Sequence, residues 1–313
     1  MKPSFVLATL VIPALATAQP NFPAPSNTRF QGFVDAQASW TSPSALNTGF
    51  ALNDAAFYLT HTVGSHSLHI DIPFQGTAHS DHEGPTLVLP TEKAQAYLKL
   101  GLGENASLMA GQFDAPFGFE SADTAENFFN AGGIVANFVP GTLVGANAEV
   151  ALGDLSLQLM VANPYNASRL LGRNPDAGAV LGYGGDESPF TASVGLLVSD
   201  TDLVDTRALL NVLFGLKAGK GAFDVEADFI TADEWGVLAQ YVHQCTDMWS
   251  FGVKGEYAKF KTDVDQWQTS VGANAQLNES VKIKADYTLL PEDIEAANTD
   301  TAHQVAISAI YSF

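Results

Sequence analysis

The sequence predicts an all-β protein, a transmembrane antiparallel up-and-down β-barrel, from three observations. Apolar and polar positions alternate along most of residues 29–313, many alternating segments reach ten residues or more, and the polar set holds Lys, Asp, Glu, Asn and Gln. A period of two is typical of a strand whose two faces meet different surroundings. About ten residues carry a tilted strand across a bilayer, whereas strands of soluble domains average about 5–6 residues. A dry core would have to pair those polar side chains, and an aqueous lumen would not.

The N-terminus has the features of a secretory signal peptide. Lys2 precedes an apolar stretch from Phe5 to Leu15, and the small residues Ala16 and Ala18 form a cleavage pattern. We therefore expect residues 1–18 to be removed and residues 19–313 to form one outer-membrane barrel domain. No later stretch is apolar for long enough to span as a helix, so an exported chain of this kind enters a membrane only as a barrel.

Alternation then recurs along the chain, and it is clearest in seven segments. These are residues 68–75, 93–100, 155–162, 207–214, 223–230, 270–277 and 281–289. Short links, such as residues 64–65 and 152–154, alternate with long ones, such as residues 114–140, as in barrels with short turns at one end. About fifteen segments are clear, and an even number is needed if both chain ends lie in the periplasm. The weak segment 176–184 best supplies the sixteenth strand; fourteen or twelve strands remain alternatives.

The final segment ends on an aromatic residue. Its apolar side consists of Val305, Ile307, Ala309, Tyr311 and Phe313. It resembles the closing strand of bacterial outer-membrane barrels, in which the terminal aromatic acts as an assembly signal. A final strand of a soluble sheet with one face on a core fits this segment equally well, and the signal peptide favours the barrel; a soluble exported β-protein remains a further alternative, which predicts that the mature chain stays soluble without detergent. Aromatic girdles mark both interfaces of a barrel, and we expect one here. Its members would be Trp40, Trp235, Trp249, Trp267, Tyr311 and Phe313.

Charge limits the partners. The formal net charge is −20, and loss of Lys2 with the signal would make it −21. Such a chain repels nucleic acid and anionic lipid surfaces. Its carboxylates must meet water, in loops or in a lumen. A hydrophobic fraction of 46% and a mean hydropathy of +0.08 suit a barrel, in which every second residue faces water. The single Cys245 excludes an internal disulfide.

One stretch carries a family resemblance. Residues 95–99 (Gln-Ala-Tyr-Leu-Lys), 110–113 (Ala-Gly-Gln-Phe) and 115–120 (Ala-Pro-Phe-Gly-Phe-Glu), with residues 141–164, resemble the β-barrel porin-2 (OmpL-like) family. The resemblance implies passive diffusion or an uncharacterised role in the outer membrane, and it brings no catalytic motif. The chain departs from the family in its few Lys and Arg residues, so no ion preference is carried over.

The loop from residue 114 to residue 139 is the main candidate site. It combines five Phe residues with carboxylates, and a long loop with its own apolar residues packs onto something. Folded into the lumen, it would narrow the pore and place a charged ring at the constriction. That ring would consist of Asp114, Glu120, Asp123 and Glu126. The alternative is an outer loop whose aromatics contact other subunits.

Charged residues on the inward register are candidates for the lumen wall. Asp224, Glu226 and Asp228 share one face of one strand and would form an acidic ladder. The predicted inward cations are Lys282, Lys284 and Arg207, with Lys93, Lys99 and Lys254 as further candidates. Because the Debye length is about 8 Å at physiological salt, only charges near the ion path select ions. We therefore expect cation preference, weakened more by neutralising Glu120 and Asp123 than by neutralising Asp81 and Glu83.

No enzyme or cofactor is expected. The sequence has no Gly-x-Ser-x-Gly, no His-Glu-x-x-His and no convincing triad order. Five of the seven His residues lie between His61 and His82, but their spacing matches no standard metal site. The expected function is an outer-membrane porin for ions and small hydrophilic solutes, acting as a homo-oligomer, a trimer or a larger ring, in contact with outer-membrane lipid. The alternative is a non-conducting structural barrel that organises lipid or neighbouring proteins.

Overall fold

The computed structural model describes residues 26–42, 49–77, 86–164, 175–185, 188–199, 207–231, 233–261, 265–291 and 301–313. The predicted signal peptide and the polar segment 79–83, with Asp81, His82 and Glu83, lie outside these ranges. The elements within the described ranges are β1 (Ser26–Ser42), β2 (Gly49–Val63), β3 (His66–Thr77), β4 (Thr86–Val88), β5 (Gln95–Gly101), β6 (Ala106–Asp114), the 3₁₀ helix η1 (Val135–Phe138), β7 (Thr142–Leu152), β8 (Leu155–Ala162), β9 (Asp176–Tyr183), β10 (Phe190–Ser199), β11 (Arg207–Ala218), β12 (Gly221–Ile230), β13 (Glu234–Gln244), β14 (Trp249–Lys259), β15 (Asp265–Gln276), β16 (Val281–Pro291) and β17 (Thr301–Ser312).

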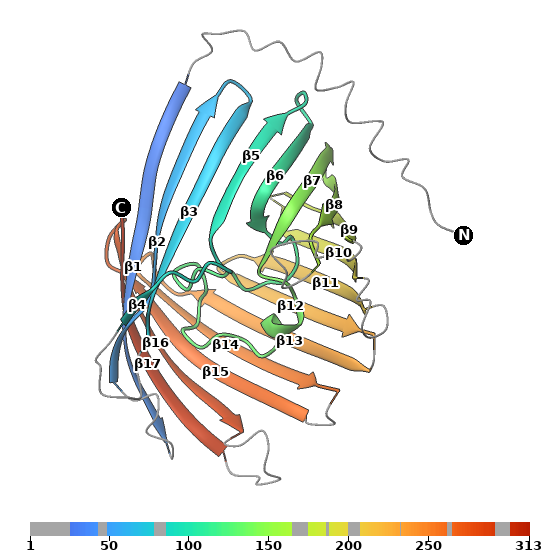
Figure 1. Cartoon of the computed structure of the whole chain (residues 1–313). Helices are drawn as coiled ribbons and strands as arrows, with labels where there is room; N and C mark the ends of the chain where they lie inside the picture. Colours follow the sequence, from blue (N-terminus) through green and yellow to red (C-terminus); the bar gives the residue numbers. More distant parts are fainter. Residues whose placement is uncertain are drawn as a thin grey trace.

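Sixteen of these strands form one closed antiparallel barrel (Figure 1). Each strand pairs with its neighbours in chain order, and β1 pairs with β17 from Phe33 opposite Ser312 to Ser42 opposite His303. Closure leaves no free sheet edge, which is the condition for a sheet to cross a membrane. The predicted fold class and the count of sixteen are confirmed.

Two strands, β9 and β4, differ from the other strands of the sheet. The weak segment is a strand: β9 pairs with both β8 and β10. Alternation of apolar and polar residues is weak in this segment because Gly178 and Gly182 occupy inward positions. The short β4 was not predicted. It pairs only with the last three residues of β3, while β5 pairs with β3 directly, so β4 adds nothing to the barrel wall.

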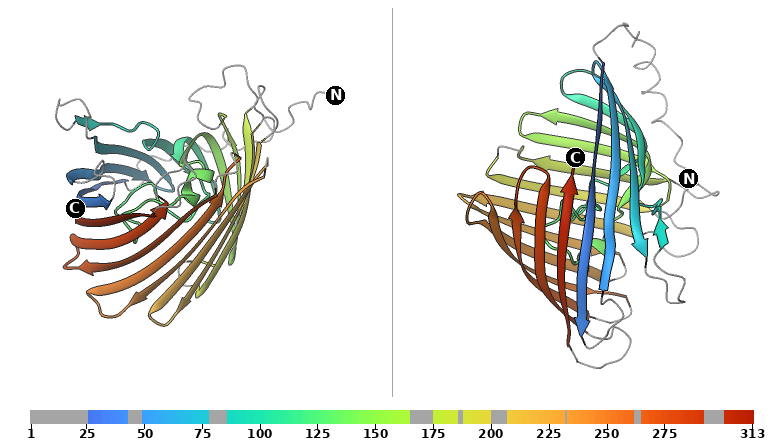
Figure 2. Two further views of the ribbon diagram at one scale, coloured as in Figure 1. Left: turned by 90° about the horizontal axis from the view of Figure 1, so that it is seen from below. Right: turned by 90° about the vertical axis from the view of Figure 1, so that its left-hand side faces the viewer.

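The two ends of the barrel differ (Figure 2). At the end that holds the C-terminus, which we call the turn end, links are as short as two residues. Gly64 and Gly153 have φ angles of 60° and 65°, a conformation that glycine adopts without strain. At the opposite end, which we call the loop end, β6 and β7 are joined by residues 115–141.

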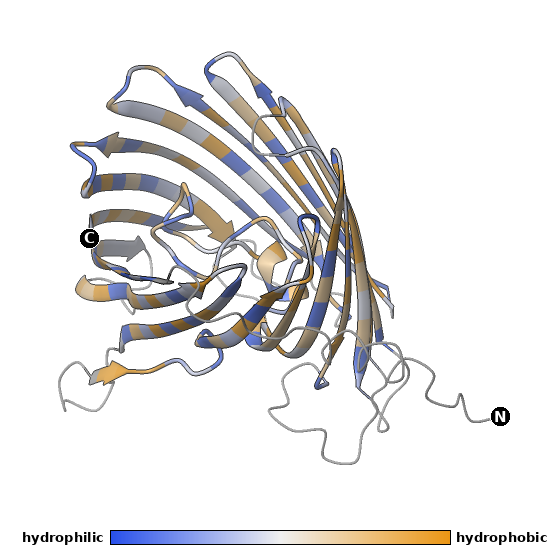
Figure 3. Ribbon diagram, turned by 90° about the horizontal axis from the view of Figure 1, so that it is seen from above, coloured by the Kyte–Doolittle hydropathy of each residue, from blue (hydrophilic) through white to orange (hydrophobic). Residues whose placement is uncertain are grey.

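The wall alternates as predicted (Figure 3). On β17, Val305 and Ile307 are 39% and 43% exposed on the outer face, whereas Ala306 and Ser308 between and beside them are 1% and 0% exposed. The expected girdle residues lie on the outer face near the strand ends: Trp40, Trp235 and Trp267 near the loop end, and Trp249, Tyr311 and Phe313 near the turn end. In the part of the chain that the structure describes, no helix has the length and apolarity to span a membrane.

The terminal Phe313 is built into the barrel seam. Its backbone exchanges hydrogen bonds of 3.1 and 3.0 Å with Gly32, beyond the last paired residues of β17. A Cβ atom at Gly32 would lie 2.8 Å from the Phe313 ring, so glycine leaves the space that this ring uses. The ring lies 6.1 Å from Phe30 and 5.9 Å from Phe57 on the outer face.

Candidate functional site in the barrel interior

Residues 115–141, which we call the inner loop, run through the inside of the barrel (Figures 1 and 2). The loop leaves β6, contacts strands β12, β14, β15, β16, β1 and β2, and returns to β7. Apart from η1 the loop has no regular structure, so many of its backbone N–H and C=O groups need partners other than its own. The expectation that this loop folds inward rather than outward is confirmed.

One part of the inner wall is apolar, and we call it the apolar wall. It extends over β6–β13 and consists of Phe113, Leu143, Met160, Val180, Leu197, Leu209, Ile230 and Leu238, each at most 6% exposed. Phe117, Val135, Phe138 and Val139 of the inner loop pack against it. Two wall glycines make room, because a Cβ at Gly195 would lie 2.7 Å from the Phe117 ring and one at Gly236 2.7 Å from Phe138.

The other part of the inner wall, which we call the polar wall, binds the loop mostly through its backbone and also through the side chains of Thr124 and Glu120. Its members are Asp35, Asp54, Glu226, Lys254, Glu256, Gln268, Asn274, Lys282, Lys284 and Asp286. Lys284 is fully buried and donates to three loop carbonyl oxygens, at 2.8 Å to Thr124, 3.1 Å to Asn127 and 3.3 Å to Phe129. Lys282 donates to the carbonyl of Ala125 at 2.5 Å.

Wall carboxylates accept the loop amides. The N–H of Phe119 donates to Glu226 at 2.9 Å, that of Asn130 to Asp286 at 2.8 Å and that of Val135 to Glu256 at 3.1 Å. Hydrogen bonds to charged groups are stronger than neutral ones, contributing about 1.5–3 kcal/mol each. The polar wall therefore supplies hydrogen-bond partners to the backbone of a loop that has few hydrogen bonds of its own.

An ion-pair network anchors the middle of the loop. Lys254 lies 2.5 Å from Glu120 and 2.9 Å from Glu256, and the three side chains are 0%, 9% and 0% exposed. Glu120 also accepts the N–H of Gly133 at 2.6 Å, and the Lys254 ammonium lies 5.5 Å from the ring centre of Phe129. The sequence predicted Glu120 at the constriction, but the structure places it in this buried network, where it shares Lys254 with Glu256.

The loop tip is held at a β-bulge. The register of β1 and β2 shifts after Asp35, and the unpaired Asn53 donates to Asp35 at 2.9 Å. Thr124 of the loop donates its hydroxyl to Asp35 at 2.7 Å and its N–H to Asp54 at 3.1 Å. Both carboxylates are buried, so they orient the tip rather than face the lumen water.

Three of the predicted constriction carboxylates form no salt bridge among the described residues. Asp114 and Glu126 are exposed, and the half-buried Asp123 accepts a hydrogen bond from the hydroxyl of Tyr58 on β2. Burial raises the pKa of Asp123 above its ordinary value, although the Tyr58 hydrogen bond acts in the opposite direction. Asp123 and Glu126 both repel the Asp114 carboxylate, and Glu126 also repels Asp123. The three therefore form one group on the side of the loop near β2 and β5.

The acidic ladder on β12 needs correction. Asp224 is partly exposed, but Glu226 and Asp228 are 1% and 0% exposed beneath the loop, where Asn211 donates to them at 3.1 and 2.7 Å. Lys284 is likewise buried. These residues face inward as expected but line no open water path. Alternation predicts the direction of a side chain and does not reveal what covers it.

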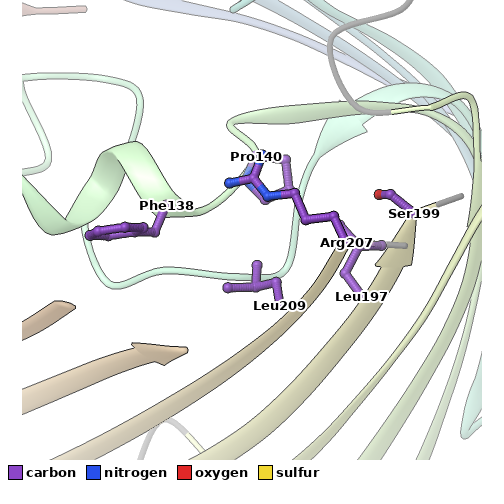
Figure 4. A pocket seen from close by; sticks show the side chains of 6 residues that line it. All are labelled: Phe138, Pro140, Leu197, Ser199, Arg207 and Leu209. Atoms are coloured by element: carbon purple, nitrogen blue, oxygen red, sulfur yellow. The ribbon is translucent and has the colours of Figure 1, made fainter. Parts of the chain in front are cut away.

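Arg207 lies away from the inner-loop carboxylates. It begins β11 at the loop end and lines a small pocket above the apolar wall, in which its side chain extends toward Pro140 of the inner loop (Figure 4). Phe138, Leu197 and Leu209 line the same pocket. A larger hollow of about 470 Å³ is bordered almost wholly by the inner loop, with Lys93 and Asp114 at its rim.

Several residues of this site were not singled out from the sequence. They are Asp35, Asp54, Tyr58, Glu256, Asp286 and the apolar wall. The signal for the apolar wall was present, because Leu209 and Ile230 occupy positions on the inward register. Within the described ranges no group of three or more His, Cys, Asp or Glu side chains is arranged to hold a metal ion.

Solved structures share the fold. The anion-selective porin from Comamonas acidovorans has a TM-score of 0.70 and 12% identity, covering 92% of this chain and 100% of the porin. The outer-membrane channel DcaP of Acinetobacter baumannii has a TM-score of 0.66 and 14% identity, covering 92% and 97%. A trimer form of OmpT, an outer-membrane protein of Vibrio cholerae, has a TM-score of 0.61 and 12% identity, covering 92% and 99%.

Sequence comparison gives the family. Curated protein sequences return no match. The family described as "Putative beta-barrel porin-2, OmpL-like" matches residues 15–313. Its porin character agrees with the expectation that the chain is not an enzyme. The chain belongs to this family and is a porin-like channel of the bacterial outer membrane.

Proposed function

We propose that the protein is a diffusion channel that prefers cations, with Asp114, Asp123 and Glu126 at its constriction. These carboxylates lie where the inner loop approaches β2 and β5. A narrow passage lined by carboxylates lowers the energy of a passing cation and raises that of an anion. The buried charges of the polar wall act much less on an ion in the passage, because they are already paired with the loop.

The proposal rests on a difference between the basic and acidic residues of the interior. Three lysines of the wall are bound to the loop or to carboxylates, whereas two carboxylates are exposed. Lys254 is paired with two carboxylates, Lys284 is enclosed by three carbonyls and Lys282 is bound to one. In contrast, Asp114 and Glu126 are exposed. Lys93 is the basic residue that opposes this group, since it acts on Asp123 and donates to the carbonyl of Ala122 at 3.5 Å. The described carboxylates therefore outnumber the basic groups at the passage.

The fold does not determine the sign of selectivity. The Comamonas porin is anion-selective and shares the barrel at 12% identity. Selectivity depends on the few charges near the ion path, which a shared barrel leaves open.

The test is the reversal potential of the protein in a planar bilayer across a KCl gradient. We expect stepwise conductance and a potential of cation-selective sign, largest at low salt. Asp114→Asn combined with Glu126→Gln should reduce it. Asp154→Asn, in the exposed turn between β7 and β8, is the matched control and should leave it unchanged. A potential of anion-selective sign would show that basic groups dominate the path.

A second candidate is a non-conducting barrel that acts through an oligomer. It is favoured by four rings that cluster on the outer face of β1–β3 and the C-terminus: Phe30, Phe57, Phe74 and Phe313, with ring centres 5.4–6.1 Å apart. An apolar aromatic patch suits a contact between copies, in a trimer or a larger ring. Bilayers that stay silent at a protein load shown by immunodetection would favour this candidate.

A further inference from the structure

A row of aromatic rings crosses the inner wall beside the proposed constriction. Phe33 on β1, Tyr58 on β2, His69 on β3 and Tyr97 on β5 follow one another with ring centres 6.3, 6.4 and 5.0 Å apart. His69 also shares a hydrogen bond of 3.1 Å with the Thr60 hydroxyl. Tyr97 packs against the apolar cluster formed by the apolar wall and the inner loop, and neither His69 nor Tyr97 makes a hydrogen bond to the loop among the described contacts.

Carboxylates lie at the loop side of this row. Asp71, two residues after His69 on β3, is only 3% exposed, and its Oδ1 has no hydrogen-bond partner among the described residues. The charges that act most strongly on Asp71 are those of Asp123 and Asp114. A buried carboxylate oxygen without a donor is costly, and like charges around it increase the cost. A cationic donor placed among these three groups would remove both penalties.

Water reaches the same wall on the turn side of the row. Lys99 is the next inward residue after Tyr97 on β5, and its side chain is 45% exposed. It pairs at 3.5 Å with Glu149, which is 40% exposed, so this stretch of wall carries little net charge. A solute entering from the turn end therefore meets a neutral polar surface, then the aromatic row, then the carboxylates.

We infer that the aromatic row and these carboxylates form a subsite for organic cations that join a primary ammonium to an apolar or aromatic body. The ammonium would donate to Asp71, Asp123 and Asp114, and the body would lie along Tyr97, His69 and Tyr58. Aromatic side chains pack against apolar or aromatic bodies, and carboxylates accept charge-assisted hydrogen bonds from the ammonium. This inference rests on the proposed constriction and names the solute class that it would favour.

The test uses 2-phenylethylammonium as the probe and ethylammonium as the matched cation without a ring. Added on the turn-end side of single channels in KCl, 2-phenylethylammonium should reduce the potassium current at about tenfold lower concentration. Tyr97→Leu should remove most of that difference and Tyr97→Phe should keep it, whereas Asp71→Asn should weaken the block by both amines. Tyr241→Leu is the control, because Tyr241 lies on the outer face of β13.

Two readouts separate this inference from the proposed function. The KCl reversal potential should be unchanged in Tyr97→Leu, since no charge is removed. Equilibrium binding of both amines to the detergent-solubilised protein, checked for fold by circular dichroism, tests the subsite even if bilayers are silent. Equal affinity for the two amines, or an unaltered ratio in Tyr97→Leu, would overturn the subsite while leaving cation selectivity in place.

Discussion

The apolar wall and the polar wall hold the same loop by different means. The apolar wall binds side chains: Phe117 and Phe138 fill positions that Gly195 and Gly236 leave open. The polar wall binds the main chain, as when Lys284 donates to three carbonyls. Burial is non-directional and stabilises in proportion to area, whereas hydrogen bonds fix direction. The apolar wall thus keeps the loop inside the barrel, and the polar wall determines the path that the backbone takes there.

Replacing Lys254 of the polar wall should have the largest effect on the loop. Lys254→Met leaves Glu120 and Glu256 buried without their cation, which should destabilise the docked loop by about 3–5 kcal/mol. We expect a lower urea midpoint, faster proteolysis within the loop and higher or noisier conductance. Lys99→Met is the control, because the Lys99–Glu149 pair is exposed and should contribute about 1 kcal/mol or less. Equal effects of the two changes would contradict a special role for the polar wall.

A change in the apolar wall contact should have a somewhat smaller effect. Phe138→Ala removes a ring that is 3% exposed and stacks on Phe260 at 5.0 Å, and it should cost about 3 kcal/mol. Because the backbone contacts remain, we expect lower stability with the loop path retained and ion selectivity close to that of the unaltered protein. Phe119→Ala, in the same loop but 36% exposed, should change the urea midpoint little. A changed reversal potential in Phe138→Ala would show that the apolar wall also positions the constriction.

The smallest expected effect concerns pH. Burial raises the pKa of Asp123, so this carboxylate loses its charge at a higher pH than a solvated aspartate, for which the pKa is about 3.9. Cation preference should therefore begin to decline as pH falls from neutral, before solvated carboxylates are protonated. In Asp123→Asn the preference should be smaller at neutral pH and flatter over the same range. Reversal potentials measured from neutral to acidic pH decide this, and identical profiles would place Asp123 away from the ion path.

The sequence predicts which side chains face the interior but not which of them the inner loop covers. Alternation correctly placed Glu226, Lys254 and Lys284 on the inward register. It assigned them to open water because an inward charged residue and a lumen-lining residue have the same pattern. The loop Phe residues correctly indicated that the loop packs inside. Nothing local to residues 115–141 could tell that Glu120 would meet Lys254, 134 positions later in the chain.

The sequence by itself determined the barrel: strand length, the period of two, the outward apolar face and the need for an even number of strands. These are local properties, because each strand carries its own two faces. Only the tertiary structure decided which charges remain free. That outcome depends on where closure brings β1, β12, β14 and β16 around one loop, and on which carboxylates then find a partner. Charges are neutralised by neighbours in space, so the ion path is a property of the closed barrel with its loop in place.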